Sequence, residues 1–94
     1  MIPVNITTQT TTVIRKQQGI LGSVIFNKPL ANGVVTIYDG VSASGTLIGT
    51  ITFPATLLNA PAPFTYNVGF NKGLTIVTSG ANQDITVTYG INEY

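Results

Sequence analysis

The chain has no cysteine, no histidine and no tryptophan, and only 7% of its 94 residues are charged. Without cysteine it forms no disulfide and carries no thiol chemistry. Catalysis needs titratable groups that act as acid, base or nucleophile, and the absence of histidine and cysteine removes two of the commonest. The composition therefore offers few candidate catalytic residues, and we expect that the protein is not an enzyme.

Charge of either sign is scarce. An ordinary soluble domain is about 25% charged, whereas this one has seven charged residues and a net charge of +1: Arg15, Lys16, Lys28, Lys72, Asp39, Asp84 and Glu93. Binding of nucleic acid needs clustered basic residues, so we expect no nucleic-acid partner. Threonine, asparagine, glycine and serine must cover the surface instead. Since so few charges do little to oppose association, we expect the protein to work inside an assembly.

Signals for membranes and secretion are also missing. No apolar run approaches the roughly 20 residues of a membrane helix. The segment Met1–Asn5 has neither the basic nor the apolar region of a signal peptide. We therefore expect no membrane partner and treat the glycosylation sequon at Asn5 as chance.

Hydrophobic residues alternate with polar ones over much of the chain, which is the period of a β-strand. Threonine, valine, isoleucine, tyrosine and phenylalanine dominate these segments, and turn residues recur about every eight to twelve positions, as in sandwiches and barrels. We predict an all-β, antiparallel, jelly-roll-like sandwich of seven or eight strands. Its predicted core comes from Val34–Tyr38, Ile51–Phe53, Phe64–Val68, Leu74–Ile76 and Ile85–Tyr89.

Two details of the predicted strands can be tested directly. The alternation groups Leu47 with Gly49, Ile51 and Phe53 on one inward face, and Val68 with Phe64, Tyr66 and Phe70 on another. The short segment Asn71–Gly73 is tight enough for a hairpin, because glycine adopts a positive φ without strain.

The N-terminal stretch differs from the rest, so we divide the chain into residues 1–18 and a sandwich domain of residues 19–94. Asn5–Thr12 is polar and rich in threonine. It is either an edge strand or frayed terminus, or an arm that adds to the sheet of a neighbouring subunit. Some of the candidate interface residues are basic and would either meet an acidic partner or solvate strand ends. The candidates are Val4, Ile6, Thr8, Thr10, Arg15, Lys16, Lys28 and Lys72.

Few residues suit a chemical site. Asp39 and Asp84 stand beside turn residues, where aspartate usually stabilises the turn. The alternatives are a carboxylate pair for glycoside hydrolysis, and a weak calcium site at Asp39 and the carbonyls of Gly40–Ser44. Ser42 and Ser44 have no base beside them in the sequence. We expect turn roles, no metal and no cofactor.

Several segments together resemble small β-rich virion proteins of tailed bacteriophages: Gly19–Pro29, Gly33–Gly40, Ser44–Ile51, Gly73–Gly80 and Asp84–Tyr89. The resemblance implies a structural protein of the virion, of which a capsid decoration (cement) protein is the leading hypothesis. Such proteins are often sandwiches or jelly rolls, frequently trimeric, and sit outside the head. The implied partners are the major capsid protein and further copies of the chain, and the implied location is the capsid exterior after synthesis in the host cytoplasm.

Two other hypotheses stay open. In the first, the chain is a module of the tail, the baseplate or a head fibre. In the second, it is a binding module for host-surface glycan, which predicts exposed tyrosines with asparagine or aspartate near one loop end. The phase of Tyr38, Tyr66 and Tyr89 with apolar neighbours instead favours the core or its rim.

Overall fold

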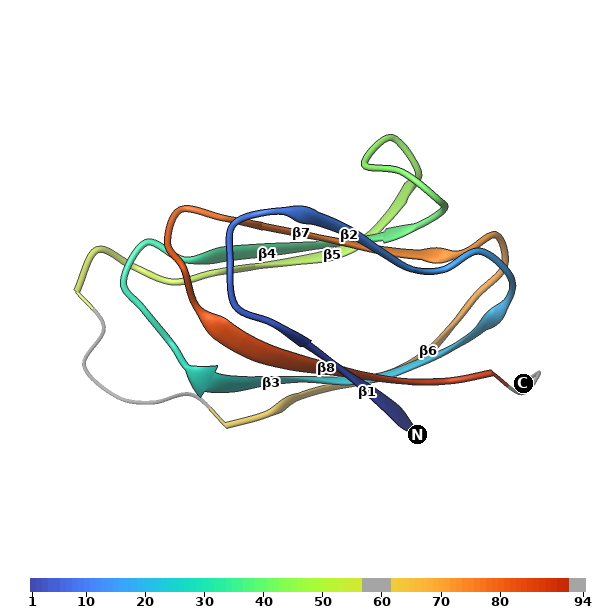
Figure 1. Cartoon of the computed structure of the whole chain (residues 1–94), viewed down its shortest axis with the longest axis horizontal. Helices are drawn as coiled ribbons and strands as arrows, with labels where there is room; N and C mark the ends of the chain where they lie inside the picture. The colour runs from blue at the N-terminus through green and yellow to red at the C-terminus, as the bar shows by residue number, and fades with distance from the viewer. Residues whose placement is uncertain (57–61, 92–94) are drawn as a thin grey trace.

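A computed structural model describes residues 1–56 and 62–91, and within them the chain forms two antiparallel four-stranded sheets, one above the other in Figure 1. None of the described residues forms a helix that could cross a membrane. The strands are β1 (Ile2–Ile6), β2 (Thr11–Arg15), β3 (Gly19–Lys28), β4 (Val34–Asp39), β5 (Thr46–Thr52), β6 (Phe64–Phe70), β7 (Leu74–Ser79) and β8 (Asp84–Gly90).

The strand order confirms the predicted fold class. One sheet has the order β1-β8-β3-β6 and the other β2-β7-β4-β5. The first strand therefore pairs with the last, the second with the seventh, the third with the sixth and the fourth with the fifth. This nested pairing is that of an eight-stranded jelly roll, in which nearly all strand contacts join distant parts of the sequence.

The inward faces of the two sheets make one hydrophobic core. The predicted contributions of Val35, Ile37, Ile51, Ile76 and Val87 are confirmed, since each is buried. Strand β3 adds three buried residues that the sequence analysis did not assign to the core, Leu21, Val24 and Phe26. Phe26 meets the rings of Phe53 and Phe64 edge to face, at centroid distances of 4.7 and 5.6 Å. Such aromatic pairs each add about 0.5–1.5 kcal/mol beyond the area that they bury.

The inward placement of Leu47 is wrong. Its side chain is 57% exposed, while Ile48 packs against the core. In the register of β4 with β5, Ile37 lies opposite Gly49 but Tyr38 lies opposite Leu47, so β5 contains one extra residue. A β-bulge of this kind reverses the faces of the residues beyond it, which an uninterrupted alternation cannot anticipate.

Val68 shares a face with buried Phe70, because its register partner Leu21 is buried and directly opposite residues point to the same face of a sheet, although Val68 itself is 38% exposed. Leu21 lies opposite Val68 and Ser23 opposite Thr65, so two residues of β6 face a single residue of β3. One of the two, Asn67, has a φ of 48°. Asparagine tolerates this left-handed conformation better than most residues, and Val68 beside it stays partly exposed because β6 is an edge strand.

The hairpin predicted at Asn71–Gly73 is also wrong, because β6 and β7 belong to different sheets. The turn crosses from one sheet to the other. Among the described glycines only Gly40 and Gly80 have a positive φ, so Gly73 is not there for its φ. A Cβ at position 73 would lie 2.7 Å from the carbonyl oxygen of Arg15, which requires glycine for close backbone approach.

Residues 1–18 form two strands rather than one, and both pair within this chain. Strand β1 is an edge of one sheet and β2 is an edge of the other, joined by residues 7–10. The connection is held by Thr78, whose hydroxyl donates to the carbonyl oxygen of Thr8 at 2.6 Å. Ile6 is buried in the core of the sandwich. The threonine-rich stretch therefore supplies backbone pairing and a few inward side chains.

Candidate functional site

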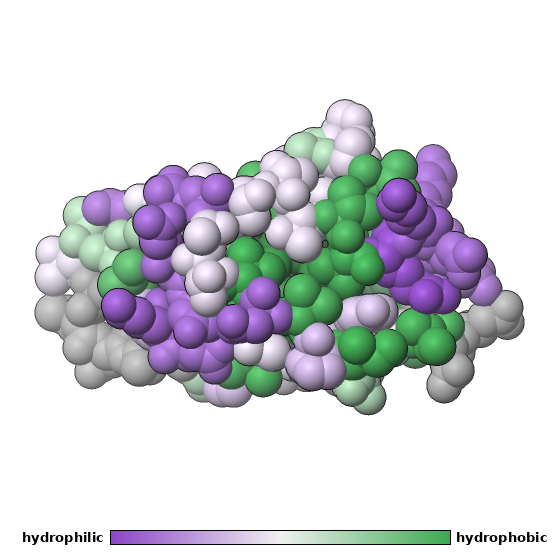
Figure 2. Space-filling model, viewed as in Figure 1, coloured by the Kyte–Doolittle hydropathy of each residue, from purple (hydrophilic) through white to green (hydrophobic). Residues whose placement is uncertain are grey.

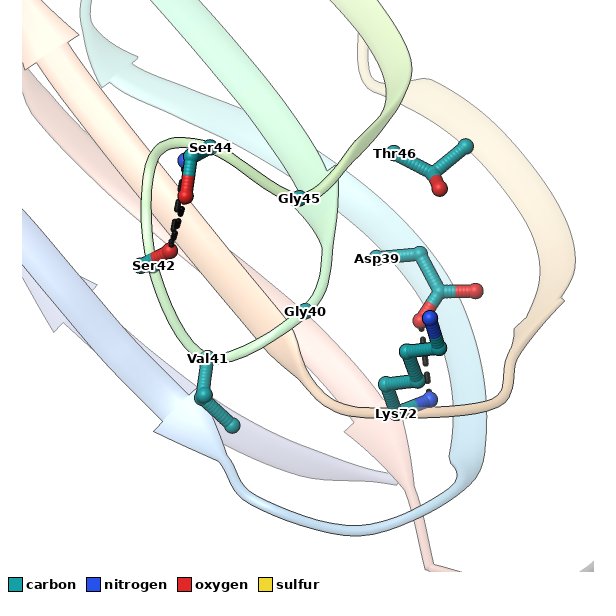
Figure 3. A pocket seen from close by; sticks show the side chains of 8 residues that line it. All are labelled: Asp39, Gly40, Val41, Ser42, Ser44, Gly45, Thr46 and Lys72. Carbon is teal, nitrogen blue, oxygen red and sulfur yellow. Dashed lines mark hydrogen bonds between the residues drawn. The ribbon is translucent and has the colours of Figure 1, made fainter.

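The structure has a polar hollow of about 350 Å³ at the end of the sandwich where the β4–β5 loop meets the β6–β7 turn (Figure 3). Its lining comes from the loop and from one residue of the turn: Asp39, Gly40, Val41, Ser42, Ser44, Gly45, Thr46 and Lys72. Small residues shape the loop because the chain doubles back on itself: a Cβ at position 45 would lie 2.6 Å from the carbonyl oxygen of Asp39.

Asp39 stabilises a turn, as predicted, but the turn lies 32 residues away in the sequence. Its two carboxylate oxygens accept hydrogen bonds from the amide of Asn71 at 3.1 and 3.0 Å, and Oδ1 accepts a third from the amide of Lys72 at 2.9 Å. Partial burial raises the pKa of Asp39. The amides of Asn71, Lys72 and Gly73, together with the charge of Lys72, outweigh that effect and hold the pKa below its ordinary value of 3.8.

The two serines of the hollow pair with each other. Their hydroxyl oxygens are 2.8 Å apart, and the amide of Ser44 donates to the Ser42 hydroxyl at 3.3 Å. The loop is anchored below by buried Thr75, whose hydroxyl donates to the carbonyl oxygen of Gly40 at 2.8 Å. With its carboxylate bonded to turn amides and its serines bonded to each other, the hollow is a turn scaffold. No base adjoins a serine here as nucleophilic catalysis requires.

Asp84 also supports local structure. Its Oδ1 accepts hydrogen bonds from the side-chain amides of Asn5 at 2.6 Å and Asn27 at 3.1 Å, which tie β1 and β3 to β8. These two bonds lower the pKa of Asp84 below 3.8, the charge of Lys28 lowers it further, and desolvation opposes them. The sequon asparagine, Asn5, is thus engaged within the sheet.

The two aspartates do not form the carboxylate pair that glycoside hydrolysis needs. Asp39 lies opposite Leu74 at the start of β7, and Asp84 follows Ser79 at its other end. Six strand residues span about 16–20 Å, whereas the catalytic carboxylates of glycosidases lie about 5–9.5 Å apart.

Within residues 1–56 and 62–91, no group of three or more acidic, histidine or cysteine side chains is placed to hold a metal ion. Glu93 lies outside the described residues.

Six of the eight predicted interface residues lie in or next to β1 and β2, the edge strands of the two sheets, and we call Ile2–Ile6 with Thr11–Arg15 the β1–β2 edge. Figure 2 shows hydrophobic residues gathered in the middle of this face, between hydrophilic groups at either end. Val4 and Ile14 are partly exposed between the two sheets, and Ile2 and Val13 are 41% and 38% exposed. Met1 and Ile91 add further exposed apolar surface near the N-terminus.

The eight interface candidates are not equally placed. Ile6 has its side chain in the core of its own chain, whereas Thr8 and Thr10 are exposed between β1 and β2. Arg15 ends β2 and donates to the carbonyl oxygen of Gln18 at 2.7 Å. Lys16 is exposed just beyond it. Lys28, at the Asp84 end, and Lys72, at the Asp39 end, lie at opposite ends of the molecule.

Tyr38, Tyr66 and Tyr89, the tyrosines within the described residues, do not form a cluster at the hollow. Tyr66 and Tyr89 pack against the hydrophobic core, as their phase predicted, and burial raises the pKa of Tyr66 above 10.0. None of the tyrosines in the described part of the chain lines the hollow beside Asp39.

Comparison with protein-family models, curated proteins and solved structures finds no match to this chain.

Proposed function

We propose that the protein is a non-catalytic structural protein of a phage virion, a decoration protein that binds the major capsid protein on the outside of the head. One observation carries the proposal: the surface is poor in charge and leaves large hydrophobic side chains uncovered. Seven such side chains are exposed among the described residues, as many as the charged residues of the whole chain.

This surface suits contact with other proteins. The cores of protein interfaces are depleted in charged residues, and exposed apolar patches mark sites of association. The exposed side chains occur on several sides of the sandwich, from Ile2 and Val13 at the β1–β2 edge to Leu47 on β5 and Val41 in the loop. A molecule with contacts on more than one side can join several neighbours on a shell. Many copies then stabilise the shell even when each contact is weak.

The fold and the hollow agree with a structural role. A jelly roll whose two sheets enclose one hydrophobic core suits a structural unit, and the hollow beside Asp39 is a scaffold of turn contacts. The resemblance of its strand and turn segments to virion proteins of tailed phages supports a phage virion as the assembly.

Mixing the purified protein with undecorated phage heads tests the proposal. We expect the protein to sediment with the heads and to raise the temperature at which they release DNA. Leu47→Lys places a charge on an exposed apolar site, and Thr50→Lys on the same strand is the matched control. Absence of both binding and added heat resistance contradicts the proposal. Labelling on intact particles separates a capsid location from one on the tail, the baseplate or a fibre.

A further inference from the structure

Within residues 1–56 and 62–91, strand β2 is paired with another strand on one side only. It pairs with β7, with Thr11 opposite Val77, Thr12 opposite Ile76 and Val13 opposite Thr75. One step before this register, Thr10 and Thr78 exchange both backbone hydrogen bonds, at 3.1 and 2.9 Å. This pair fixes the phase of the ladder.

Bonded and non-bonded pairs alternate along an antiparallel ladder. Because Thr10 is a bonded residue, Thr12 is the next one, and Thr11 and Val13 direct their amides and carbonyls away from β7. The edge of β2 thus presents two N–H groups and two carbonyl groups to an added strand. Both residues also carry exposed side chains, Val13 being 38% exposed.

The other three sheet edges carry devices that discourage strand addition. Strand β1 contains Pro3, which has no amide hydrogen. Strand β5 has the bulge at Ile48, and β6 has the bulge with Asn67 in a left-handed conformation. Strand β2 has no proline, glycine or charge from Thr11 to Ile14, and its irregularity falls at its end, after Val13. Edges without such protection accept strands.

We propose that β2 pairs antiparallel with β2 of a second copy of this chain, across a two-fold axis at Thr12. In this register Thr11 faces Val13 of the second copy, and Val13 faces Thr11. Both are the residues whose backbone groups point outward, so the two strands form four hydrogen bonds. The pairing joins two four-stranded sheets into a continuous sheet of eight strands.

The charges permit this contact. In the proposed register the two Arg15 residues lie on opposite sides of the axis, each three residues from Thr12. The two Arg15 residues stand six strand positions apart, roughly 20 Å at 3.3 Å per residue. That separation exceeds the Debye length of about 8 Å at physiological ionic strength, so their repulsion is screened. No other charged side chain occurs between Ile2 and Arg15.

The apolar side chains of the β1–β2 edge point to the same occupant. Val4 and Ile14 lie partly exposed on β1 and β2, the edge strands of the two sheets. When β2 meets β2 of the second copy, the two β1–β2 edges face each other. The second copy then covers the apolar residues and presents an identical uncharged surface to them, as a two-fold contact requires.

This inference is independent of the virion role, since it concerns the isolated protein. A two-fold contact yields a dimer, in place of the trimer that the resemblance implies. Sedimentation or light scattering of the purified protein therefore decides between them. We expect the mass of two 9.9-kDa chains. A monomer at all concentrations, or a trimer, overturns the proposal.

Substitution at Val13 tests the location of the contact. Val13→Pro removes an amide that points away from β7, and Val13→Thr keeps both the amide and the branched shape as the control. We expect the proline variant to raise the dimer dissociation constant about tenfold or more and the threonine variant to leave it within about twofold. A dimer that tolerates Val13→Pro contradicts the proposal.

Two measurements remain decisive if the proline variant folds poorly. Val13→Lys leaves the backbone intact but places two ammonium groups near the axis, so it also dissociates the dimer. Hydrogen exchange of the unmodified protein provides the direct readout. The amides of Thr11 and Val13 become protected as concentration rises, while the exposed amide of Thr8 does not. Concentration-independent exchange at Thr11 and Val13 overturns the proposal.

Discussion

Gln83 packs so closely against Gly33 that a Cβ at position 33 would lie 2.1 Å from its Cδ. The glutamine is 3% exposed, and its Oε1 accepts a hydrogen bond from the amide of Leu30 at 3.2 Å. Gly33 in turn accepts from the amide of Phe53 at 2.9 Å. One side-chain amide therefore closes the end of the sandwich where the β3–β4 and β7–β8 connections meet.

Gly33→Ala will destabilise the protein by about 1–3 kcal/mol, the usual cost of forcing extra atoms into a packed site. The cost is steric, because Gly33 is not among the residues with a positive φ. Urea unfolding measures it. Gln83→Ala vacates the space, so the double variant will lose less than the sum of the two single losses. Additive losses would show that the two residues do not share this space.

Asp39→Ala will destabilise the protein by about 1 kcal/mol, because it removes the acceptor for the amides of Asn71 and Lys72. Because Asp39 is only partly buried, water replaces part of the lost hydrogen bonding and keeps the loss small. Ser42→Ala, in the same hollow, is the control and will change the unfolding free energy by less than about 0.5 kcal/mol. Equal effects of the two substitutions would contradict the turn role of Asp39.

Stability will fall in acid. The pKa values of Asp39 and Asp84 are both lowered in the folded protein, so the unfolded chain takes up protons first as pH falls. Their contribution is present above the ordinary value of 3.8 and is lost as pH drops through the lower folded values. The urea midpoint measured from pH 7 to pH 2 records the loss. The variant with Asp39→Asn and Asp84→Asn will show a flatter profile, and an unchanged profile would refute the assignment.

The bulge in β5 predicts opposite effects at neighbouring positions. Leu47→Thr will change the unfolding free energy by less than about 0.5 kcal/mol, because Leu47 is exposed. Ile48→Thr will cost about 1–2 kcal/mol, because Ile48 packs against the core and its replacement carries a hydroxyl. Thermal or urea unfolding of the two variants measures both changes in the unfolding free energy. A larger loss of unfolding free energy at Leu47 than at Ile48 would contradict the bulge and support an uninterrupted alternation in β5.

The sequence predicted the fold class because strand patterning is a local property. Ile85 and Val87, two positions apart, both face the core as the period of two requires. The turn role of Asp39 was also readable, since aspartate beside glycine bonds nearby amides. The identity of the bonded turn was not, because Asn71 meets Asp39 only after β4 and β6 have been brought to the same end of the sandwich.

Local sequence alone thus determined that the chain forms β-strands, that these pack as a sandwich around alternating apolar residues, and that few charges cover the outside. Tertiary structure alone decided the bulge that exposes Leu47, the crossing at Asn71–Gly73, and the meeting of β1 and β2 at one edge. The reason is that register and strand neighbours depend on pairing between segments far apart in the sequence. No local pattern encodes that pairing.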